Sequence, residues 1–355
     1  MDFYIGAYIV KFNAVIGNPP YQTDIKGANK TYRDGLYPAF IDFAKAVSFT
    51  VLFIVPAKFL FNFSHRLQQW SLSELQNTHL KVIDYFADGK QVFPQVVLRG
   101  GLAIVLWDKL QTFEPISKQY APVGVFIPYP ELKSIVKKVG TFSATESMEH
   151  GFSQAVYRYS SSLYQDYPNL REQKIHSLDT NAFSKASAIF YDKPFDNSDH
   201  YLAVIGLYKT RLKVKYLKQD YIVPVSNIAT YKVIISRATG RGKFGETISR
   251  VLIAPPQTIY TDTFRCIGSY KTFAIAEAME KYIKTKFARA MLSLLKITSS
   301  CTQSKWRWVP IQNFTKYSDI NWTKSISEID QQLYRKYNLI QAEIDFIEHN
   351  VQPMT

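Results

Sequence analysis

The chain has 355 residues, 46% of them hydrophobic, and a formal net charge of +14. This length and composition predict a folded protein with two domains. The 2 cysteines exclude a disulfide-stapled scaffold, and the 6 histidines show no metal-ligand spacing, so no metal site is predicted. The most apolar run, residues 49–63, is interrupted by Pro56 and Lys58 and is too short to cross a bilayer. We therefore expect a cytoplasmic protein without a membrane span.

Most of the positive charge falls in one part of the chain. Residues 201–300 contain 17 Lys and Arg but only 5 Asp and Glu, whereas the rest of the chain is close to neutral. A local basic excess of this kind favours a polyanionic partner, and double-stranded DNA is such a partner. The alternative is a solvated basic surface that binds nothing.

The first predicted element is a short buried strand, residues 14–17, which ends at two prolines. Pro19 and Pro20 stop the strand and stiffen the turn, and Asn18 is kept out of the helical region because a proline follows it. The Asn18 side-chain oxygen and a main-chain carbonyl of this turn can accept hydrogen bonds from an exocyclic amine, while Tyr21 can stack on a flat ring. A flipped adenine requires these contacts. A plain proline turn with a buried tyrosine is the alternative.

This turn also carries a family pattern. Asn18-Pro19-Pro20-Tyr21 after a hydrophobic strand resembles the catalytic signature of DNA adenine-N6 methyltransferases. The longer run, residues 12–22, is similar to restriction-modification methylases of the Eco57I type. The resemblance implies a site-specific, adenine-specific DNA methyltransferase. It also implies that these four residues are catalytic and that S-adenosylmethionine donates the methyl group.

The same resemblance implies a Rossmann-like α/β methyltransferase sheet, of which only part is expected. In the family a glycine-rich loop after the first strand holds S-adenosylmethionine, and two more strands precede the catalytic turn. Residues 3–7 contain one glycine and lie too close to the turn to form that loop. The expectation is therefore the catalytic-side half of the sheet, with the cofactor half lost or supplied by a second polypeptide. The isolated chain is then expected to be inactive, or nearly so.

The part after the turn alternates between helix and strand, as an α/β fold does. A polar loop, residues 22–35, contains Lys26, Lys30 and Arg33, which could seek phosphate or simply be solvated. The apolar periodicity then predicts helices over 36–47 and 60–75 and strands over 49–55, 80–86 and 102–107.

A second motif, residues 91–96 (QVFPQV), resembles a later motif of the same methylases. In that motif the aromatic residue packs against the extruded adenine. The resemblance implies that Phe93 completes the adenine pocket opened by Tyr21. Packing of Phe93 in the protein core is the alternative. The Gly100-Gly101 pair before the next predicted strand is also similar to the family.

A domain boundary is predicted within residues 111–130, which contain four prolines and show no periodicity. The predicted domains are residues 1–115, the catalytic-side half of the methyltransferase; residues 131–300, a mixed α/β DNA-recognition domain; and residues 301–355, a helical C-terminal segment. Within the last segment, residues 326–351 predict a pair of acidic helices rather than a DNA surface.

One group of candidate DNA contacts follows a predicted strand over residues 231–237. The strand ends at Arg237, and a turn with two glycines then brings Arg241 and Lys243 close to it. Such a cluster could grip phosphate or guanine, since arginine can bond guanine with two parallel hydrogen bonds. A flexible hairpin tip is the alternative.

Two further lysines are candidates for contacts with the DNA backbone. A helix is predicted over residues 274–297 from its apolar stripe. Lys271 precedes this helix and Lys284 lies on it. The stripe itself is expected to belong to the core.

Two other functions stay open. A non-catalytic DNA-binding specificity module would explain the basic excess without a cofactor loop. A restriction nuclease is the third candidate, and Asp166, Glu172 and Lys174 come nearest to a carboxylate-lysine set. The two carboxylates are too close in sequence for the usual arrangement of such a site.

Overall fold

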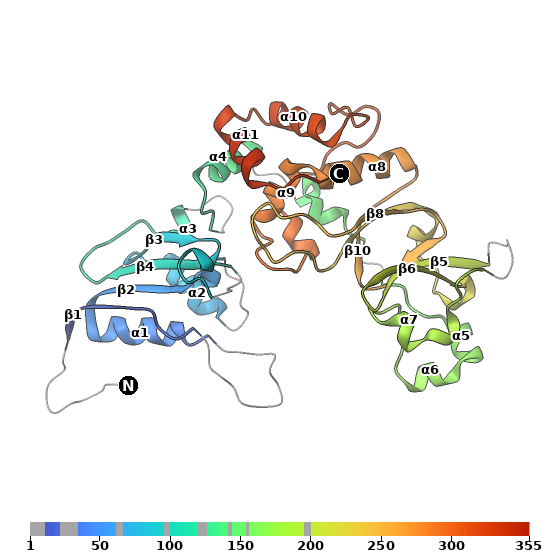
Figure 1. The fold of residues 1–355 in the computed structure, drawn as a ribbon, viewed down its shortest axis with the longest axis horizontal. Helices are drawn as coiled ribbons and strands as arrows, with labels where there is room; N and C mark the ends of the chain where they lie inside the picture. Colours follow the sequence, from blue (N-terminus) through green and yellow to red (C-terminus); the bar gives the residue numbers. More distant parts are fainter. Residues whose placement is uncertain are drawn as a thin grey trace. The chain divides into compact units, whose positions relative to one another are not determined.

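The computed structural model describes residues 11–21, 35–61, 67–95, 100–119, 126–140, 144–153, 156–194 and 200–354. The chain divides into two compact units, which we call unit 1 (residues 1–137) and unit 2 (residues 138–355). Both units combine helices and strands, so the predicted α/β class is confirmed at that level (Figure 1). The predicted functional domains are a finer assignment and stay a prediction.

Unit 1 is built on a four-stranded sheet with the order β1-β2-β4-β3. Its strands are β1 (Phe12–Gly17), β2 (Ser48–Pro56), β3 (Leu80–Phe86) and β4 (Leu102–Asp108). β1 runs parallel to β2, whereas β4 runs antiparallel to both β2 and β3. β1, β2 and β3 therefore point the same way, and their carboxyl ends meet the start of β4 at one edge of the sheet.

The helices of unit 1 are α1 (Tyr37–Val47), α2 (Gln68–Gln76), α3 (Ile116–Gln119) and the first part of α4 (Pro130–Val139). α1 has Pro38 in its first turn, where the missing N–H costs no hydrogen bond. It buries Ile41 and Ala44 and packs against β2, while Phe40 and Phe43 are exposed. The helix predicted over 36–47 and the strands predicted over 49–55, 80–86 and 102–107 are confirmed.

The helix predicted over residues 60–75 is confirmed from Gln68 onward, whereas Leu60 and Phe61 belong to a different element. A 3-10 turn, Ala57–Phe61, follows β2, and α2 begins only at Gln68. Phe59, Leu60 and Phe61 are all buried, so this segment lacks the single apolar stripe of an amphipathic helix. Residues 62–66 lie outside the described part of the chain.

The prediction that residues 14–17 form a buried strand is half right. β1 is a strand, but most of it is exposed, with Phe12 at 54% and Ile16 at 73% of their full accessible area. The reason is its position: among the described strands β1 pairs only with β2, so it lies at an edge of the sheet. A run of apolar residues predicts burial without showing where in the sheet a strand lies.

Unit 2 contains two three-stranded sheets. One has the order β6-β5-β9, with β5 (Tyr201–Tyr208), β6 (Arg211–Lys218) and β9 (Thr258–Tyr260). The other has the order β10-β7-β8, with β7 (Tyr231–Ser236), β8 (Val251–Ala254) and β10 (Phe264–Tyr270). β7 confirms the strand predicted over 231–237.

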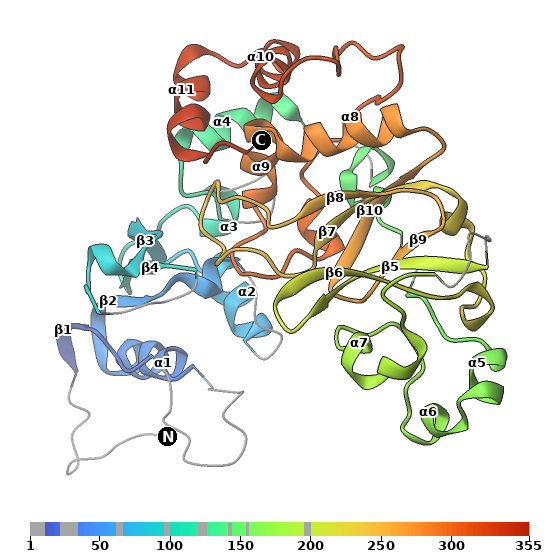
Figure 2. The same cartoon turned by 45° about the vertical axis from the view of Figure 1, so that its right-hand side comes forward.

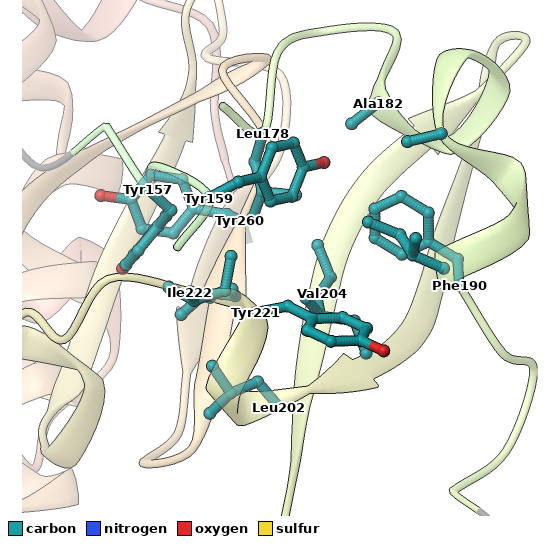
Figure 3. Packing of buried hydrophobic residues seen from close by; sticks show 14 of the residues in the cluster. Tyr157, Tyr159, Leu178, Ala182, Phe190, Leu202, Val204, Tyr221, Ile222 and Tyr260 are labelled. Atoms are coloured by element: carbon teal, nitrogen blue, oxygen red, sulfur yellow. The ribbon is translucent and has the colours of Figure 1, made fainter. Parts of the chain in front are cut away.

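Short helices precede the first of these sheets, and their apolar residues form a core with it. They are α5 (Ser161–Asp166), α6 (Pro168–Glu172) and α7 (Ala182–Lys185) (Figure 2). Several tyrosines belong to this core, including Tyr157, Tyr159 and Tyr260 (Figure 3). The rings of Tyr157 and Tyr260 meet edge to face with centroids 5.0 Å apart, a favoured aromatic geometry.

The single helix predicted over residues 274–297 is two helices, α8 (Phe273–Lys284) and α9 (Lys286–Ser293). Thr285 has extended backbone angles, and its hydroxyl accepts from the Ala288 N–H at the start of α9. The apolar stripe continues across the break, which is why the periodicity did not reveal it. The break is stabilised from the C-terminal segment, where the Asp330 carboxylate accepts from the N–H groups of Lys286 and Phe287, each at 2.9 Å.

The C-terminal segment ends in the predicted pair of helices, α10 (Ile326–Lys336) and α11 (Gln341–Asn350). α10 starts with a capping box in which Ser325 and Glu328 satisfy each other's backbone N–H groups. The ring of Tyr337 stacks on Phe287 with centroids 4.8 Å apart. Residues 301–355 are therefore part of the core of unit 2.

Two further facts bear on the class of protein. Within the described ranges, no helix is long and apolar enough to span a lipid bilayer. Cys266, in β10, and Cys301 are both free thiols, and both are fully buried.

Candidate functional site

The edge of the unit 1 sheet where β1, β2 and β3 end is the natural place for a ligand. In parallel sheets, ligands bind outside the carboxyl ends of the strands, where loops rather than strands face solvent. Three segments reach this edge: Asn18 to Tyr21 after β1, Ala57–Phe61 after β2, and the turn that leads to Phe93 after β3. The strand register fixes them there, since Gly17 pairs with Phe53 and Leu102 pairs with both Pro56 and Phe86.

The Asn-Pro-Pro-Tyr turn divides its residues between core and solvent. Pro19 is buried and anchors the turn, whereas Asn18 and Pro20 are exposed and Tyr21 is half-buried. The Asn18 amide is therefore available to a ligand while the backbone beside it is held in place. The role of this turn as a hydrogen-bonding corner for an exocyclic amine stays a prediction.

Tyr21 is held through its backbone. Its carbonyl oxygen accepts from the Leu36 N–H at 3.2 Å, where the chain returns just ahead of α1. Burial raises the pKa of the Tyr21 phenol, and the Asn18 side chain offsets part of that rise. The phenol oxygen is shielded from solvent, yet no hydrogen bond of ordinary geometry satisfies it. Lys26, Lys30 and Arg33 of the predicted loop lie outside the described residues.

Phe93 follows β3 and Tyr21 follows β1, so both lie at the same edge of the sheet. The two strands are the first and the last in the order β1-β2-β4-β3. The Phe93 ring is half-buried, and the Phe93 N–H donates to the Gly89 carbonyl at 2.9 Å, so a tight turn after β3 fixes its position. No ring contact between Phe93 and Tyr21 is found among the described residues. Joint packing of both rings on one adenine stays a prediction.

Gly101 holds this edge together. Its carbonyl accepts from the Ala57 N–H at 3.0 Å, and its φ is +77°. A Cβ added at Gly101 would lie 2.2 Å from the Phe86 carbonyl oxygen. Only glycine permits this approach, so the ends of β2, β3 and β4 are tied together beside the candidate site.

The comparison with protein families agrees with this geometry. Residues 7–93 match the model of the Eco57I restriction-modification methylase family. Over this segment the chain resembles the Eco57I methylases. The match contains β1, the Asn-Pro-Pro-Tyr turn, α1, β2, β3 and the turn before Phe93, so the resemblance indicated by the two motifs is confirmed.

A curated relative points the same way. A protein of Mycoplasma pneumoniae named "Uncharacterized adenine-specific methylase" is 29% identical over 103 residues. The match covers 28% of this chain and 24% of the Mycoplasma protein. The chain therefore spans only about a quarter of the relative's length.

In unit 2, the predicted contact Arg237 belongs to a cluster with two other charged residues. Asp262 accepts from Arg237 Nη1 through one oxygen and from Arg265 Nη1 through the other, each at 2.5 Å. The carboxylate thus fixes two guanidinium groups, of which Arg237 is about half exposed, at 49% of its side-chain area. A fixed guanidinium loses less conformational entropy when it binds.

The glycine turn after Arg237 is filled by the protein itself. The N–H groups of Arg241 and Gly242 donate to the Glu246 carboxylate, at 2.7 and 2.8 Å, and Lys296 forms an ion pair with the same carboxylate. A Cβ on Gly240 would lie 2.2 Å from Glu246. The glycines therefore let the backbone approach Glu246, in the place where a ligand was expected. The side chains of Arg241 and Lys243 are exposed.

The other two predicted contacts differ in availability. Lys271 is exposed and forms no salt bridge with a described residue. Lys284 forms an ion pair with Glu280 at 3.2 Å, and its side chain is only 18% exposed. Lys271 is therefore much the better placed of the two to meet a phosphate.

Several basic residues of the 201–300 segment are structural. Lys232, Arg289 and Lys296 are buried. The Lys232 ammonium donates to the carbonyls of Asn227, Thr230 and Pro255 at 2.6 to 3.3 Å. Burial lowers the pKa of Lys232 to about 8 and that of Arg289 to about 10.

The sequence interpretation missed a basic group in β6 and the turn before it. Lys209, Arg211 and Lys213 are exposed and form no salt bridge with any residue that the structure describes. Their alternate spacing on a strand was the signal that could have identified them.

The residues named for a nuclease do not form a metal site. Asp166 accepts from the Tyr221 hydroxyl at 2.6 Å, and Lys174 lies in the left-handed backbone region with φ 55°. Within the described ranges, no group of three or more His, Cys, Asp and Glu side chains could hold a metal ion.

Proposed function

We propose that unit 1 carries the acceptor side of a DNA adenine-N6 methyltransferase of the restriction-modification type. The observation that carries this proposal is the Asn-Pro-Pro-Tyr turn at the carboxyl edge of a parallel strand pair, inside the segment that matches the Eco57I methylases. The sheet order β1-β2-β4-β3, in which only β4 is reversed, supports the catalytic-side half of a Rossmann-like methyltransferase sheet.

The chemistry at the turn is a pair of accepted hydrogen bonds and a stacked ring. The Asn18 side-chain oxygen and a carbonyl of the Pro19-Pro20 turn accept from the adenine NH2 group. Both bonds increase the electron density on N6 and orient its lone pair toward an incoming methyl group. Tyr21 covers the face of the extruded base, which contributes about 1–3 kcal/mol of stacking.

The methyl donor is S-adenosylmethionine, which supplies an electrophilic methyl group when bound. Among the described residues of unit 1, no strand is followed by a glycine-rich turn of the kind that cradles this cofactor. These residues therefore fit the acceptor and not the donor. A second polypeptide that binds the donor is the proposed partner, and the isolated chain is proposed to transfer methyl groups poorly.

The DNA is proposed to be held mainly by unit 2. The basic excess of residues 201–300, the Arg237 cluster and the exposed side chains of Arg241, Lys243 and Lys271 support this role. On this proposal residues 131–300 recognise the DNA sequence, residues 301–355 close the fold of that domain, and the protein acts in the cytoplasm.

The deciding measurement is transfer of radiolabelled methyl groups from S-adenosylmethionine to duplex DNA, followed by analysis of the labelled base. We expect N6-methyladenine when a donor-binding polypeptide is fused or added, and little or none without it. Asn18→Ala should reduce transfer to background, because the acceptor of the NH2 group is lost. Asn13→Ala, an exposed asparagine in β1 that precedes the turn, is the matched control and should retain activity.

Two outcomes would decide against this proposal. Equal transfer by the Asn18→Ala and wild-type proteins would remove the turn from the active site. Duplex binding without methyl transfer, even with a donor-binding polypeptide present, would favour a non-catalytic specificity module.

A further inference from the structure

We propose that the β5–β6 hairpin, residues 201–218, is a ribbon that lies in a groove of duplex DNA. This inference rests on the proposed function, because it assigns the surface that holds the DNA substrate. The hairpin contains 5 Lys and Arg and no Asp or Glu. Within the 201–300 segment it is a continuous element whose charges are all positive, and its residues 208–214 are exposed.

The hairpin extends beyond its own sheet. β9 pairs only with Ala203, Val204 and Ile205 of β5, whereas β5 and β6 pair along their full length, up to Tyr208 opposite Arg211. Residues 206–213 therefore form a two-stranded ribbon without a third described strand (Figure 2). Lys209, at the tip, has φ 57°, as a two-residue hairpin turn requires.

The two faces of the ribbon differ in chemistry. Alternate residues of a strand point to opposite faces, so Arg211, Lys213 and Lys215 share one face. Leu212 and Val214 lie on the other face and are 40% and 47% exposed. Exposed cations on one face and exposed aliphatic side chains on the other give the ribbon both kinds of group that read a DNA groove.

The base of the ribbon is fixed and its tip is free. Lys215 forms an ion pair with Asp192 at 3.0 Å, and the outer edge of β6 pairs with Tyr191 at Tyr216. Toward the tip, Lys209, Arg211 and Lys213 are exposed and form no salt bridge with a described residue. Lys209 and Arg211, nearest the tip, thus form no ion pair with a described carboxylate, while Lys213 acts on Asp192 without forming a salt bridge to it.

This contrasts with several other basic residues of the segment. Lys232, Arg289 and Lys296 are buried, and Arg237, Arg265 and Lys284 are paired with carboxylates. The basic composition therefore overstates the charge that the surface presents, and a large share of what remains is on the hairpin.

A groove of duplex DNA matches the shape and charge of this ribbon better than a flat anionic surface does. The major groove of B-DNA admits a two-stranded β-ribbon, and its walls are lines of phosphates. With Leu212 and Val214 facing the base edges, where they can contact thymine methyl groups, the long side chains of Arg211 and Lys213 can neutralise phosphates of the groove walls.

The test is binding of a fluorescein-labelled duplex of mixed sequence, measured by anisotropy at several salt concentrations. The full-length triple variant Lys209→Ala, Arg211→Ala, Lys213→Ala should bind about tenfold more weakly or worse, and the log–log salt slope should fall by about 2 to 3, since each phosphate contact contributes about 0.9. The matched control is Lys316→Ala, Lys324→Ala, Arg335→Ala, which removes the same charge from exposed sites in the C-terminal segment and should change the slope little.

The outcomes separate this inference from the proposed function. If the wild-type protein does not bind duplex DNA, the proposed function fails. If the hairpin variant binds like wild type, or if both triple variants lose equal affinity, the hairpin assignment is overturned while DNA binding by unit 2 stands. Unfolding curves of the variants should overlay wild type, because all the changed side chains are exposed.

Discussion

The two units present their candidate residues in opposite ways. In unit 1 the Asn-Pro-Pro-Tyr turn follows β1, the most exposed strand of its sheet, and β1 is held by its neighbour β2. In unit 2 many residues of the expected functional type are inside, such as Lys232 and Arg289, where they bond backbone carbonyls. In unit 1 the motif thus pointed to candidate residues that are exposed, whereas in unit 2 composition alone did not separate surface charge from structural charge.

The contrast has a physical cause. A short motif constrains the local backbone, and its prolines and asparagine act wherever the strand lies. Charge counted over a hundred residues is an average, and the fold decides which of those charges meet solvent. Unit 2 can bury ammonium and guanidinium groups because turns and helix ends leave carbonyl oxygens that accept from them.

The largest effect should come from the buried frame of unit 1. Leu102→Ala, in β4, removes a side chain with no exposed area and should lower the free energy of unfolding by about 2–5 kcal/mol. Ile16→Ala, in exposed β1, should change it by about 0.5 kcal/mol or less. Urea denaturation with hydrogen exchange of the β2 and β4 amides measures both. Equal losses would mean that β1 is covered in solution.

The next effect concerns Asp330, the C-terminal carboxylate that caps α9. Asp330→Ala should destabilise unit 2 by about 1–3 kcal/mol, because the N–H groups of Lys286 and Phe287 lose their acceptor. Burial raises the pKa of Asp330 from 3.8 to about 7. The folded state therefore holds this proton more tightly, and its contribution to stability is full in acid and is lost as the pH rises from about 4 to about 7.

A pH series of unfolding curves checks this second prediction. Asp330→Asn keeps an oxygen acceptor but cannot ionise, so it should flatten the slope of stability between those pH values. The exposed carboxylate of Asp345, on α11, offers the control Asp345→Asn, which should leave the slope as in wild type. An unchanged slope in Asp330→Asn would contradict the assignment.

The smallest expected effects distinguish the buried Lys232 from the exposed Lys271. Lys232→Met leaves three carbonyls without their donor and should cost about 1–2 kcal/mol of stability. It should not alter the salt dependence of DNA binding. Lys271→Met should do the reverse, with stability retained and the salt slope reduced by about 0.9 if Lys271 meets a phosphate. Equal slopes for both variants would remove Lys271 from the interface.

The sequence correctly predicted the elements whose structure follows from their own local residue pattern. α1, β2, β3, β4 and β7 follow from apolar periodicity and from Pro38 in the first turn of α1. The closing pair α10 and α11 was predicted from the acidic run over residues 326–351, although Asp330 and Glu343 of that run are buried. These signals lie within about a dozen residues of the chain, which is the range that periodicity can reach.

The sequence did not predict the features that depend on contacts between residues far apart in the chain. The break at Thr285 is stabilised by Asp330, which lies 44 positions from Lys286, and the apolar periodicity continues across it. The glycine turn at residues 240–242 is closed by Glu246 and Lys296 rather than by a ligand. The exposure of β1 depends on which strands pair with it. The completion of the adenine pocket by Phe93, and the roles of the five predicted DNA-contacting residues, stay predictions.

The rate at which the two buried thiols are alkylated reports how unit 2 opens. Burial raises the pKa of Cys266, and it raises that of Cys301 to about 11, so neither thiolate forms readily in the folded protein. Cys266 belongs to the central region of β10, whereas the Cys301 N–H donates to the Arg237 carbonyl at 2.9 Å, where the C-terminal segment joins the core. If a maleimide reacts with Cys301 before Cys266, the C-terminal segment detaches before global unfolding. Both cysteines are native, so no label site has to be added.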